Sequence, residues 1–369
     1  MAARAVAPLS ATHKKLALRL PMVHVTAGVL CACLGVSAAA DVPRTEDGKP
    51  DLTGTYNVAT LTPLERPREF GDSLYLSPEK AQELAATAAA LKAADQEQSD
   101  PDRQAPPEGG DGSEGAAGNV GGYNAFWIDN GDAAMMVDGK FRTSIITEPK
   151  NGRRPALTEA GRKRMMGFFS LFGKNTGTAW WVGREGPGPY DHMEMRPLGE
   201  RCLLGFSSTG GPPMLPALYN NMKRIVQTAD HIMIQAEMIH DARVIRMNAV
   251  HRPPHIRTWM GDSVGHWEGD TLVVDTTNFK ARPALYGASD NLHVVERFTR
   301  KHNGDLLYEF TVNDLTVWQQ PWGGEYTWPA SGDKVFEYAC HEGNYALGNI
   351  MRGARLLEQD AAGQSASGR

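Results

Sequence analysis

Residues 262–277, DSVGHWEGDTLVVDTT, decide the fold of this chain. Apolar and polar side chains alternate on both sides of the turn at 268–270, a pattern typical of a β-hairpin. The period of two extends outward over residues 224–314, where further turns fall at His240-Asp241 and at 303–305. We therefore expect a mainly β fold with a few helices, built on an antiparallel meander. Such a meander commonly closes into a barrel or folds as a sandwich, because closure removes exposed strand edges.

Local signals place the helices and one more strand. Ser77 and Pro78 are a preferred N-cap and a preferred first helical residue, and they predict a helix to about residue 94. Thr158 and Glu159 open a second, amphipathic helix to about residue 169. Residues 343–359 predict a third helix, and residues 52–59 predict a short strand.

Composition divides the chain further. The stretch 95–122 is rich in Gly, Pro and acidic residues and has almost no large apolar side chain, so it predicts a mobile linker. The expected organisation is a signal peptide over 1–40, a strand, helix and linker over 41–122, a main β-rich domain over 123–359, and a disordered tail over 360–369.

The first forty residues predict export. Basic residues at positions 14–19 precede an apolar run over 25–35 and a small-residue ending at Ala40, which is the pattern of a secretory signal peptide. The run is too short to span a bilayer. Leu30 to Cys33 allows an alternative, a lipoprotein-type cleavage site. Both interpretations predict a periplasmic or secreted protein.

Charge and hydropathy argue against two kinds of partner. Loss of residues 1–40 removes four basic residues and no acidic one, which changes the formal net charge from −5 to −9. An acidic chain is a poor partner for nucleic acid. No later apolar run approaches the roughly 18 residues of a membrane span.

Two cysteines stay in the exported chain, Cys202 and Cys340. In an oxidising compartment they are expected to form one disulfide. The alternative is a pair of separate buried thiols.

Common catalytic motifs are absent from the sequence: there is no G-x-S-x-G, no H-E-x-x-H and no glycine-rich phosphate or dinucleotide loop. Three imidazoles lie close in sequence to a carboxylate, at His192, His240 and His341. A contact of that kind raises the basicity of the imidazole, although a surface ion pair is the alternative. The pair His341-Glu342 is the preferred catalytic candidate, because a disulfide at Cys340 would hold it rigidly.

A proline-rich segment carries the next candidates. His251 and His255 have the spacing of zinc ligands on a helix, but Pro253-Pro254 excludes a helix there, so a metal site stays an alternative. Arg257 could bind a phenolic or anionic oxygen, and Trp259 could provide an aromatic wall.

Further contacts to a substrate are expected from His255 and Asp262, on the same stretch of chain, and from Tyr219 and Asn221, which follow the rigid loop 210–216. The alternatives are side-chain packing for Trp259 and Arg257 and a structural turn for Tyr219 and Asn221.

Four stretches resemble a large family of exported bacterial proteins that are known mainly as sequences. They are RTEDGKPDLTG at 44–54, RTWMGDSVGHWEGDTLVVDTTNF at 257–279, LHVVERFTR at 292–300 and YACHEGNY at 338–345. The resemblance implies export and a β-rich fold but brings no agreed catalytic residues. The family's usual arginine is Val264 here, so no role for it can be carried over.

The sequence also resembles the cofactor-independent lyases that remove formaldehyde from phenylcoumaran-type lignin dimers. The resemblance implies a base for a primary alcohol and a donor for the departing aryl oxygen, with no redox cofactor. In this chain, His341 backed by Glu342 is the expected base. Arg257 or Tyr219 would stabilise the phenolate, and Trp259 would stack on an aryl ring.

Two other functions stay open. A lipocalin-like carrier would place residues 52–56, LTGTY, as the first strand of a calycin-type barrel around a small apolar ligand. A metal-dependent hydrolase would use His251 and His255. In each case a small molecule is the expected partner, and a homo-oligomer is not excluded.

Overall fold

The computed structural model describes residues 41–95, 128–170, 177–205, 208–285 and 287–367. The predicted signal peptide and almost all of the predicted linker lie outside these ranges. Within them, none of the helices combines the length and the apolar character that crossing a membrane requires.

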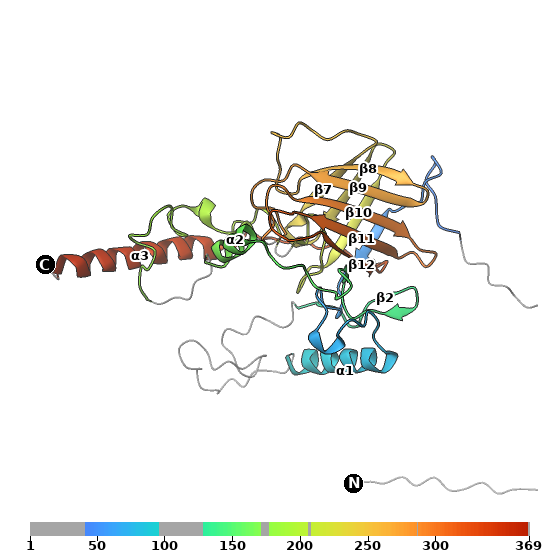
Figure 1. Ribbon diagram of the computed structural model, residues 1–369, viewed down its shortest axis with the longest axis horizontal. Coiled ribbons are helices and arrows are strands. Elements are labelled where there is room, and N and C mark those ends of the chain that lie inside the picture. Colours follow the sequence, from blue (N-terminus) through green and yellow to red (C-terminus); the bar gives the residue numbers. More distant parts are fainter. Residues whose placement is uncertain (1–40, 96–127, 171–176, 206–207, 286, 368–369) are drawn as a thin grey trace, which may run out of the picture. The chain divides into compact units, whose positions relative to one another are not determined.

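Strands make up most of the regular structure (Figure 1). The strands are β1 (Gly54–Asn57), β2 (Met136–Val137), β3 (Lys140–Phe141), β4 (Ile146–Glu148), β5 (Met222–Gln227), β6 (His231–Ala236), β7 (Ala242–Met247), β8 (Asp262–Glu268), β9 (Thr271–Thr277), β10 (His293–Arg300), β11 (Leu306–Asn313) and β12 (Trp322–Trp328). The helices are α1 (Pro78–Asp95), α2 (Glu159–Phe169) and α3 (Tyr345–Ser367), with short 3₁₀ turns at Arg68–Phe70, Met193–Met195 and Met238–His240.

One ten-stranded sheet carries the fold, in the order β1-β5-β6-β7-β8-β9-β10-β11-β12-β4. The expected turns at 240–241, 268–270 and 303–305 do separate neighbouring strands. The prediction of a continuous antiparallel meander is wrong at one place, because β7 and β8 pair in parallel. A parallel pair needs a crossover, and residues 248–261, the crossover segment, supply it. The sequence pattern fixes which residues are strands but not the direction in which the chain returns.

The sheet curls, and its first strand meets the chain beyond β12. Tyr56 of β1 forms an antiparallel bridge with Ala330. Asn57 donates its N–H to the Pro329 carbonyl at 3.0 Å, and Ser331 donates to the Thr55 carbonyl at 2.8 Å. The outer edge of β1 is therefore partly covered by residues 329–331, which agrees with the barrel-like fold expected from the sequence.

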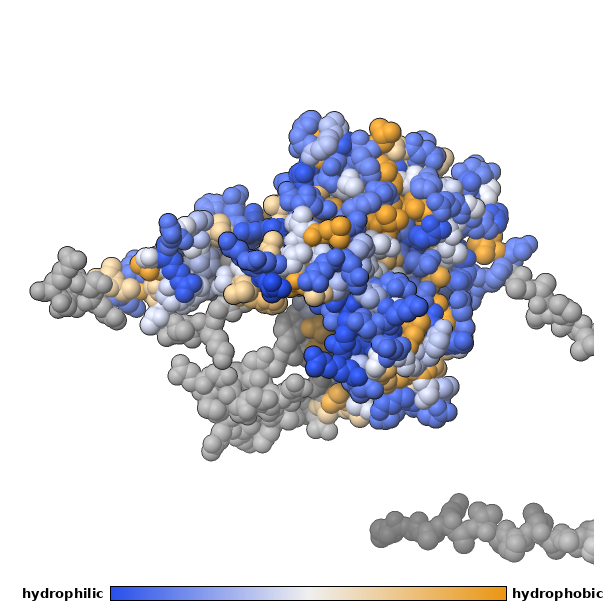
Figure 2. Space-filling model, in the orientation of Figure 1, coloured by the Kyte–Doolittle hydropathy of each residue, from blue (hydrophilic) through white to orange (hydrophobic). Residues whose placement is uncertain are grey.

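The inward face of the curled sheet is apolar and aromatic. Trp318, Trp322, Tyr326 and Trp328 are each at most 1% exposed, so this aromatic run is core. Charged and polar side chains cover most of the opposite, visible surface, with apolar side chains in separate groups (Figure 2).

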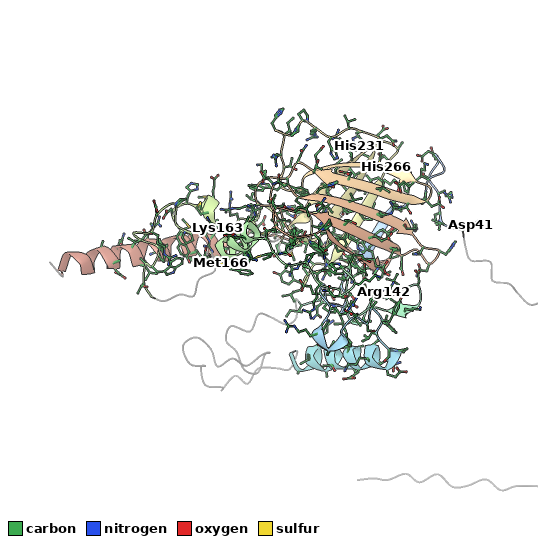
Figure 3. The ribbon with its side chains drawn as sticks, in the orientation of Figure 1. Asp41, Arg142, Lys163, Met166, His231 and His266 are labelled. Atoms are coloured by element: carbon green, nitrogen blue, oxygen red, sulfur yellow. A yellow bond between two sulfur atoms is a disulfide. The ribbon has the colours of Figure 1, made fainter. Side chains whose placement is uncertain are left out.

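The helices follow their local signals. The Ser77 hydroxyl accepts from the Lys80 N–H, and the Thr158 hydroxyl accepts from the Gly161 N–H, as N-caps do. On α2, Lys163 and Met166 lie on the exposed side (Figure 3). Helix α3 continues past residue 360, where a disordered tail was expected, because an established helix propagates easily through an Ala-containing sequence.

The Cys202–Cys340 disulfide is confirmed, with Cα atoms 5.7 Å apart. It ties the segment that precedes α3 to the loop region before β5. Trp181 donates to the Glu358 carboxylate at 2.7 Å and fixes α3 to the same region.

Candidate functional site

A cavity of about 570 Å³ lies beside α2, a volume suited to a small organic ligand. Its walls come from four stretches of chain: α2, residues 187–199, residues 204–205 and residues 281–288. Most lining side chains are apolar: Phe168, Pro187, Pro189, Met195, Pro197, Leu198, Leu204, Pro283 and Ala284. We call it the α2 cavity.

Two arginines give the α2 cavity its charge. Arg164 is fixed by its Nε donating to the Ala288 carbonyl at 2.8 Å and by Nη2 donating to the Ala281 carbonyl. Arg282 also lines the cavity and is exposed. An apolar pocket with guanidinium groups suits a flat molecule that carries an anionic or phenolic oxygen.

Directly behind one wall of the α2 cavity lies a buried carboxylate. The N–H of Gly205, a lining residue, donates to Oδ2 of Asp241 at 2.8 Å. Burial raises the pKa of Asp241 to about 6, against the opposing effects of the Gly205 hydrogen bond and the nearby Lys223 charge. A carboxyl group with this pKa can exchange a proton near neutral pH.

Lys223 is close enough for its charge to act on this carboxylate. Its side chain is fully buried on the inward face of β5, and its Nζ finds no hydrogen-bond partner among the described residues. Burial lowers the pKa of Lys223 to about 8, although the charges of Asp241 and Glu237 oppose the change. We call Lys223, Glu237 and Asp241 the buried lysine group.

A second polar group crosses the interior of the sheet. Arg243 on β7 pairs with both carboxylate oxygens of Glu296 on β10, at 2.5 and 3.0 Å. Tyr308 donates to Glu296 at 2.8 Å and accepts from the Met214 N–H at 2.9 Å. The Met214 carbonyl accepts from Tyr326. This interior network holds the loop around Met214 inside the barrel.

Burial raises the pKa values of Tyr308 and Tyr326 well above that of an exposed tyrosine. Both hydroxyls therefore stay protonated donors at neutral pH. The network uses them to hold the Met214 backbone, which is 0% exposed, so it is a structural arrangement.

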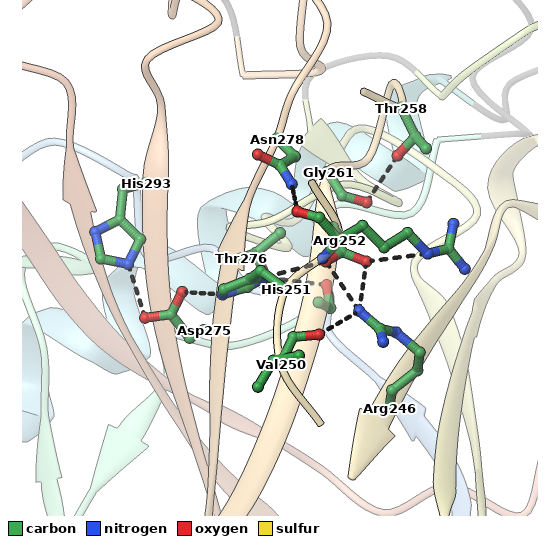
Figure 4. Close-up of polar contacts among 12 residues, drawn as sticks. Arg246, Val250, His251, Arg252, Thr258, Gly261, Asp275, Thr276, Asn278 and His293 are labelled. Atoms are coloured by element: carbon green, nitrogen blue, oxygen red, sulfur yellow. Dashed lines mark hydrogen bonds and ion pairs between the residues drawn. The ribbon is translucent and has the colours of Figure 1, made fainter. Parts of the chain in front are cut away.

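A third polar group lies on the outer face of the sheet (Figure 4). His251 contacts two carboxylates: its Nδ1 lies 3.1 Å from Asp262 and its Nε2 lies 2.9 Å from Asp275. The Nε2 of His293 lies 2.8 Å from the other oxygen of Asp275. Both ring nitrogens of His251 therefore lie within hydrogen-bond distance of a carboxylate oxygen.

Arg246 strengthens this group with two contacts of 3.0 Å to Asp262, and the Arg252 N–H donates to the same carboxylate at 2.8 Å. Burial by itself would raise the pKa values of Asp262 and Asp275, but the hydrogen bonds from their cationic neighbours outweigh it and lower both. The group fastens the crossover segment to β8 and β9.

The other candidates on the crossover segment are held by the fold. Arg257 donates to the carbonyls of Phe279 at 2.9 Å and Asp290 at 2.7 Å. Trp259 has the Lys280 ammonium 4.5 Å from its ring centre. His255 is exposed and His251 is enclosed by carboxylates, so these two histidines do not form a shared metal site. The described residues include no group of three metal-binding side chains.

His341 and Glu342 are exposed and follow the disulfide. No hydrogen bond or ion pair joins His341 to Arg257 in the described part of the chain. Tyr219 is half-buried. Asn221 is buried, and its amide exchanges hydrogen bonds of 2.8 Å with the Ala217 backbone and donates to the Asp129 carbonyl at 2.7 Å.

None of the candidate site residues named from the sequence lines the α2 cavity. Among them, His251 and Asp262 belong to the polar group on the outer face of the sheet. The structure therefore assembles its candidate site from other residues.

Comparison of the chain with protein-family models, with curated proteins and with solved structures gave no match. The candidate site therefore depends on its own geometry.

Sequence reasoning did not single out Lys223 or the pairing of Arg243 with Glu296, although a signal exists. Lys223, Arg243 and Glu296 each occupy an inward-facing position of a strand, two residues away from an apolar core residue. A charge at an inward position of a period-two pattern indicates a buried polar group.

We predict that Arg243→Met destabilises the protein by about 3–5 kcal/mol, because it leaves Glu296 charged and unpaired inside the barrel. The double variant Arg243→Met/Glu296→Leu should recover at least half of the loss. Urea unfolding of the four proteins of the cycle measures both effects. If the stability losses of the two single variants add up to the loss of the double variant, the two side chains do not depend on each other.

The His293–Asp275 contact predicts a pH-dependent stability. The hydrogen bond to Asp275 raises the pKa of His293 and outweighs the opposing effect of burial. Its stabilisation is therefore complete below the unfolded value of about 6.5 and is lost as the pH rises through the folded value. At low pH the same stabilisation is lost as the pH falls through the folded pKa of Asp275, which lies below the unfolded value of about 3.9.

Thermal unfolding of wild type and His293→Gln from acid to alkaline pH tests this expectation. The difference in stability should be largest between about pH 4 and pH 6.5. In an Asp275→Asn variant, His293→Gln should not change stability more between about pH 4 and pH 6.5 than at other pH values. A difference that grows above neutral pH would contradict the assigned charge pair.

Proposed function

We propose that this protein binds a small, flat aromatic compound bearing a phenolic or anionic oxygen in the α2 cavity. The observation that carries the proposal is the cavity itself: about 570 Å³, apolar side chains on most of its walls, and the fixed guanidinium of Arg164. The apolar walls favour an aromatic ring, and the arginine favours an oxygen with negative charge. The disulfide supports the further proposal that the protein works outside the cytoplasm.

A pair of tryptophan substitutions tests the location of binding. Leu198 lines the α2 cavity, whereas Leu203 is 41% exposed and does not. Leu198→Trp should fill the cavity and weaken binding of para-hydroxystilbene at least about tenfold, or about 1.4 kcal/mol, in a fluorescence titration. Leu203→Trp should bind like wild type. Equal affinity in both variants would place the ligand elsewhere.

A second candidate function is the cofactor-independent lyase. Asp241 favours it, because a carboxyl group with a pKa of about 6 lies one hydrogen bond behind the cavity wall at Gly205. In the reaction, a base takes the proton of the primary alcohol, the adjacent carbon–carbon bond breaks to release formaldehyde, and the electron pair forms the stilbene double bond. The aryl oxygen leaves as a phenolate, so no redox cofactor is required. The guanidinium of Arg164 would stabilise that phenolate.

A turnover assay separates the lyase from the carrier. Metal-stripped protein is incubated without cofactor with a phenylcoumaran dimer, and formaldehyde and stilbene absorbance are followed together. The lyase predicts equal amounts of both products, a loss of at least about a hundredfold in Asp241→Asn, and unchanged rates in His341→Ala. Binding without either product would support the carrier, and loss of activity in His341→Ala would restore the exposed histidine as the base.

A further inference from the structure

Lys223 differs from the other cation buried inside the barrel. Arg243 is 3% exposed and its guanidinium is paired with Glu296 through two hydrogen bonds. Lys223 is 0% exposed, and its amine has no hydrogen-bond partner among the described residues. A buried polar group that serves only to hold a structure is normally hydrogen-bonded. The bare amine of Lys223 therefore needs another explanation.

The two carboxylates whose charges act on Lys223 are turned to other partners. Asp241 accepts the N–H of Gly205 at 2.8 Å, and Glu237 accepts the N–H of Phe336 at 2.9 Å. Each carboxylate thus holds the backbone of another segment and leaves the amine unbonded. These segments are residues 202–205, which contain Gly205, and residues 331–340, which contain Phe336.

The disulfide joins these two segments into one unit. Cys202 lies at the start of the first segment and Cys340 at the end of the second. Asn344 adds a contact across the same junction, because its side-chain amide donates to the Glu200 carbonyl at 3.2 Å. We call residues 202–205, residues 331–340 and their disulfide the cover.

We propose that Lys223 is a nucleophilic amine that captures a small aldehyde as an imine, and that the cover controls access to it. The uncharged amine adds to the carbonyl carbon, its proton moves to the carbonyl oxygen, and loss of water forms the carbon–nitrogen double bond. No oxidant or reductant takes part. The site is separate from the α2 cavity, and its test does not require the proposed function.

The chemistry of the amine agrees with this geometry. With a pKa of about 8, roughly a tenth of the Lys223 amines are uncharged at pH 7, compared with fewer than about one in a thousand for an exposed lysine. Because the amine makes no hydrogen bond, attack on a carbonyl breaks none.

Trapping of the imine tests the proposal. The full-length protein is incubated at pH 7 with acetaldehyde and cyanoborohydride, and N-ethyllysine is mapped by mass spectrometry. Three proteins are compared: wild type with its disulfide, Cys202→Ser/Cys340→Ser, and that double variant with Lys223→Met. Exposed Lys334, on the cover itself, is the internal reference. Near-UV circular dichroism of the buried tryptophans reports whether each protein stays folded.

The expected result is labelling of Lys223 at least about tenfold faster in the folded double-serine protein than in wild type, and faster than labelling of Lys334. Should the double variant not fold, the wild type reduced by a phosphine under native conditions takes its place. Lys223 labelling no faster than Lys334 in a folded protein without the disulfide would overturn the amine site. Equal rates of Lys223 labelling with and without the disulfide would overturn the proposal that the cover controls access to Lys223.

Discussion

The pairing of Arg243 with Glu296 is the interaction on which the interior of this protein depends. The two residues lie on β7 and β10, which are separated in the sheet by β8 and β9, so their contact crosses the space enclosed by the curl. Both side chains are buried. The Glu296 carboxylate is bonded by Arg243 and the Tyr308 hydroxyl, and Arg243 Nη2 also lies 3.5 Å from the Met214 sulfur. Through Tyr308 and Tyr326 the pair also positions the Met214 backbone. The barrel is thus filled by side chains and a loop at the level of this pair.

Because the interior is filled, the candidate ligand site lies away from the centre of the barrel. The α2 cavity is built outside the sheet from four segments, and Gly205 in its wall is hydrogen-bonded to Asp241 of the buried lysine group. The binding surface and this titratable carboxyl group are therefore adjacent.

On the outer face of the sheet, charged side chains hold the crossover segment in place. The sequence offered His251 as a possible metal ligand and did not single out His293. In the structure they belong to a chain of alternating histidines and aspartates that fastens the crossover segment to β8 and β9. Parallel pairing of β7 with β8 requires that crossover, and these contacts fasten its first residues to Asp262 and Asp275.

The sequence by itself determined the local structure: the hairpin turns, the period of two in the strands, and the helix starts at Ser77 and Thr158. It also indicated the pairing of Cys202 with Cys340. The turns, strands and helix starts depend on neighbours a few residues apart, and the disulfide was expected because the predicted signal peptide takes Cys31 and Cys33 and leaves two cysteines to pair. Tertiary structure alone decided the parallel step between β7 and β8, the contact of Arg243 with Glu296, and the α2 cavity. Each of these joins segments distant in sequence, and their distances depend on strand order and on the curl of the sheet. A local pattern of side chains does not reveal the strand order or the curl of the sheet.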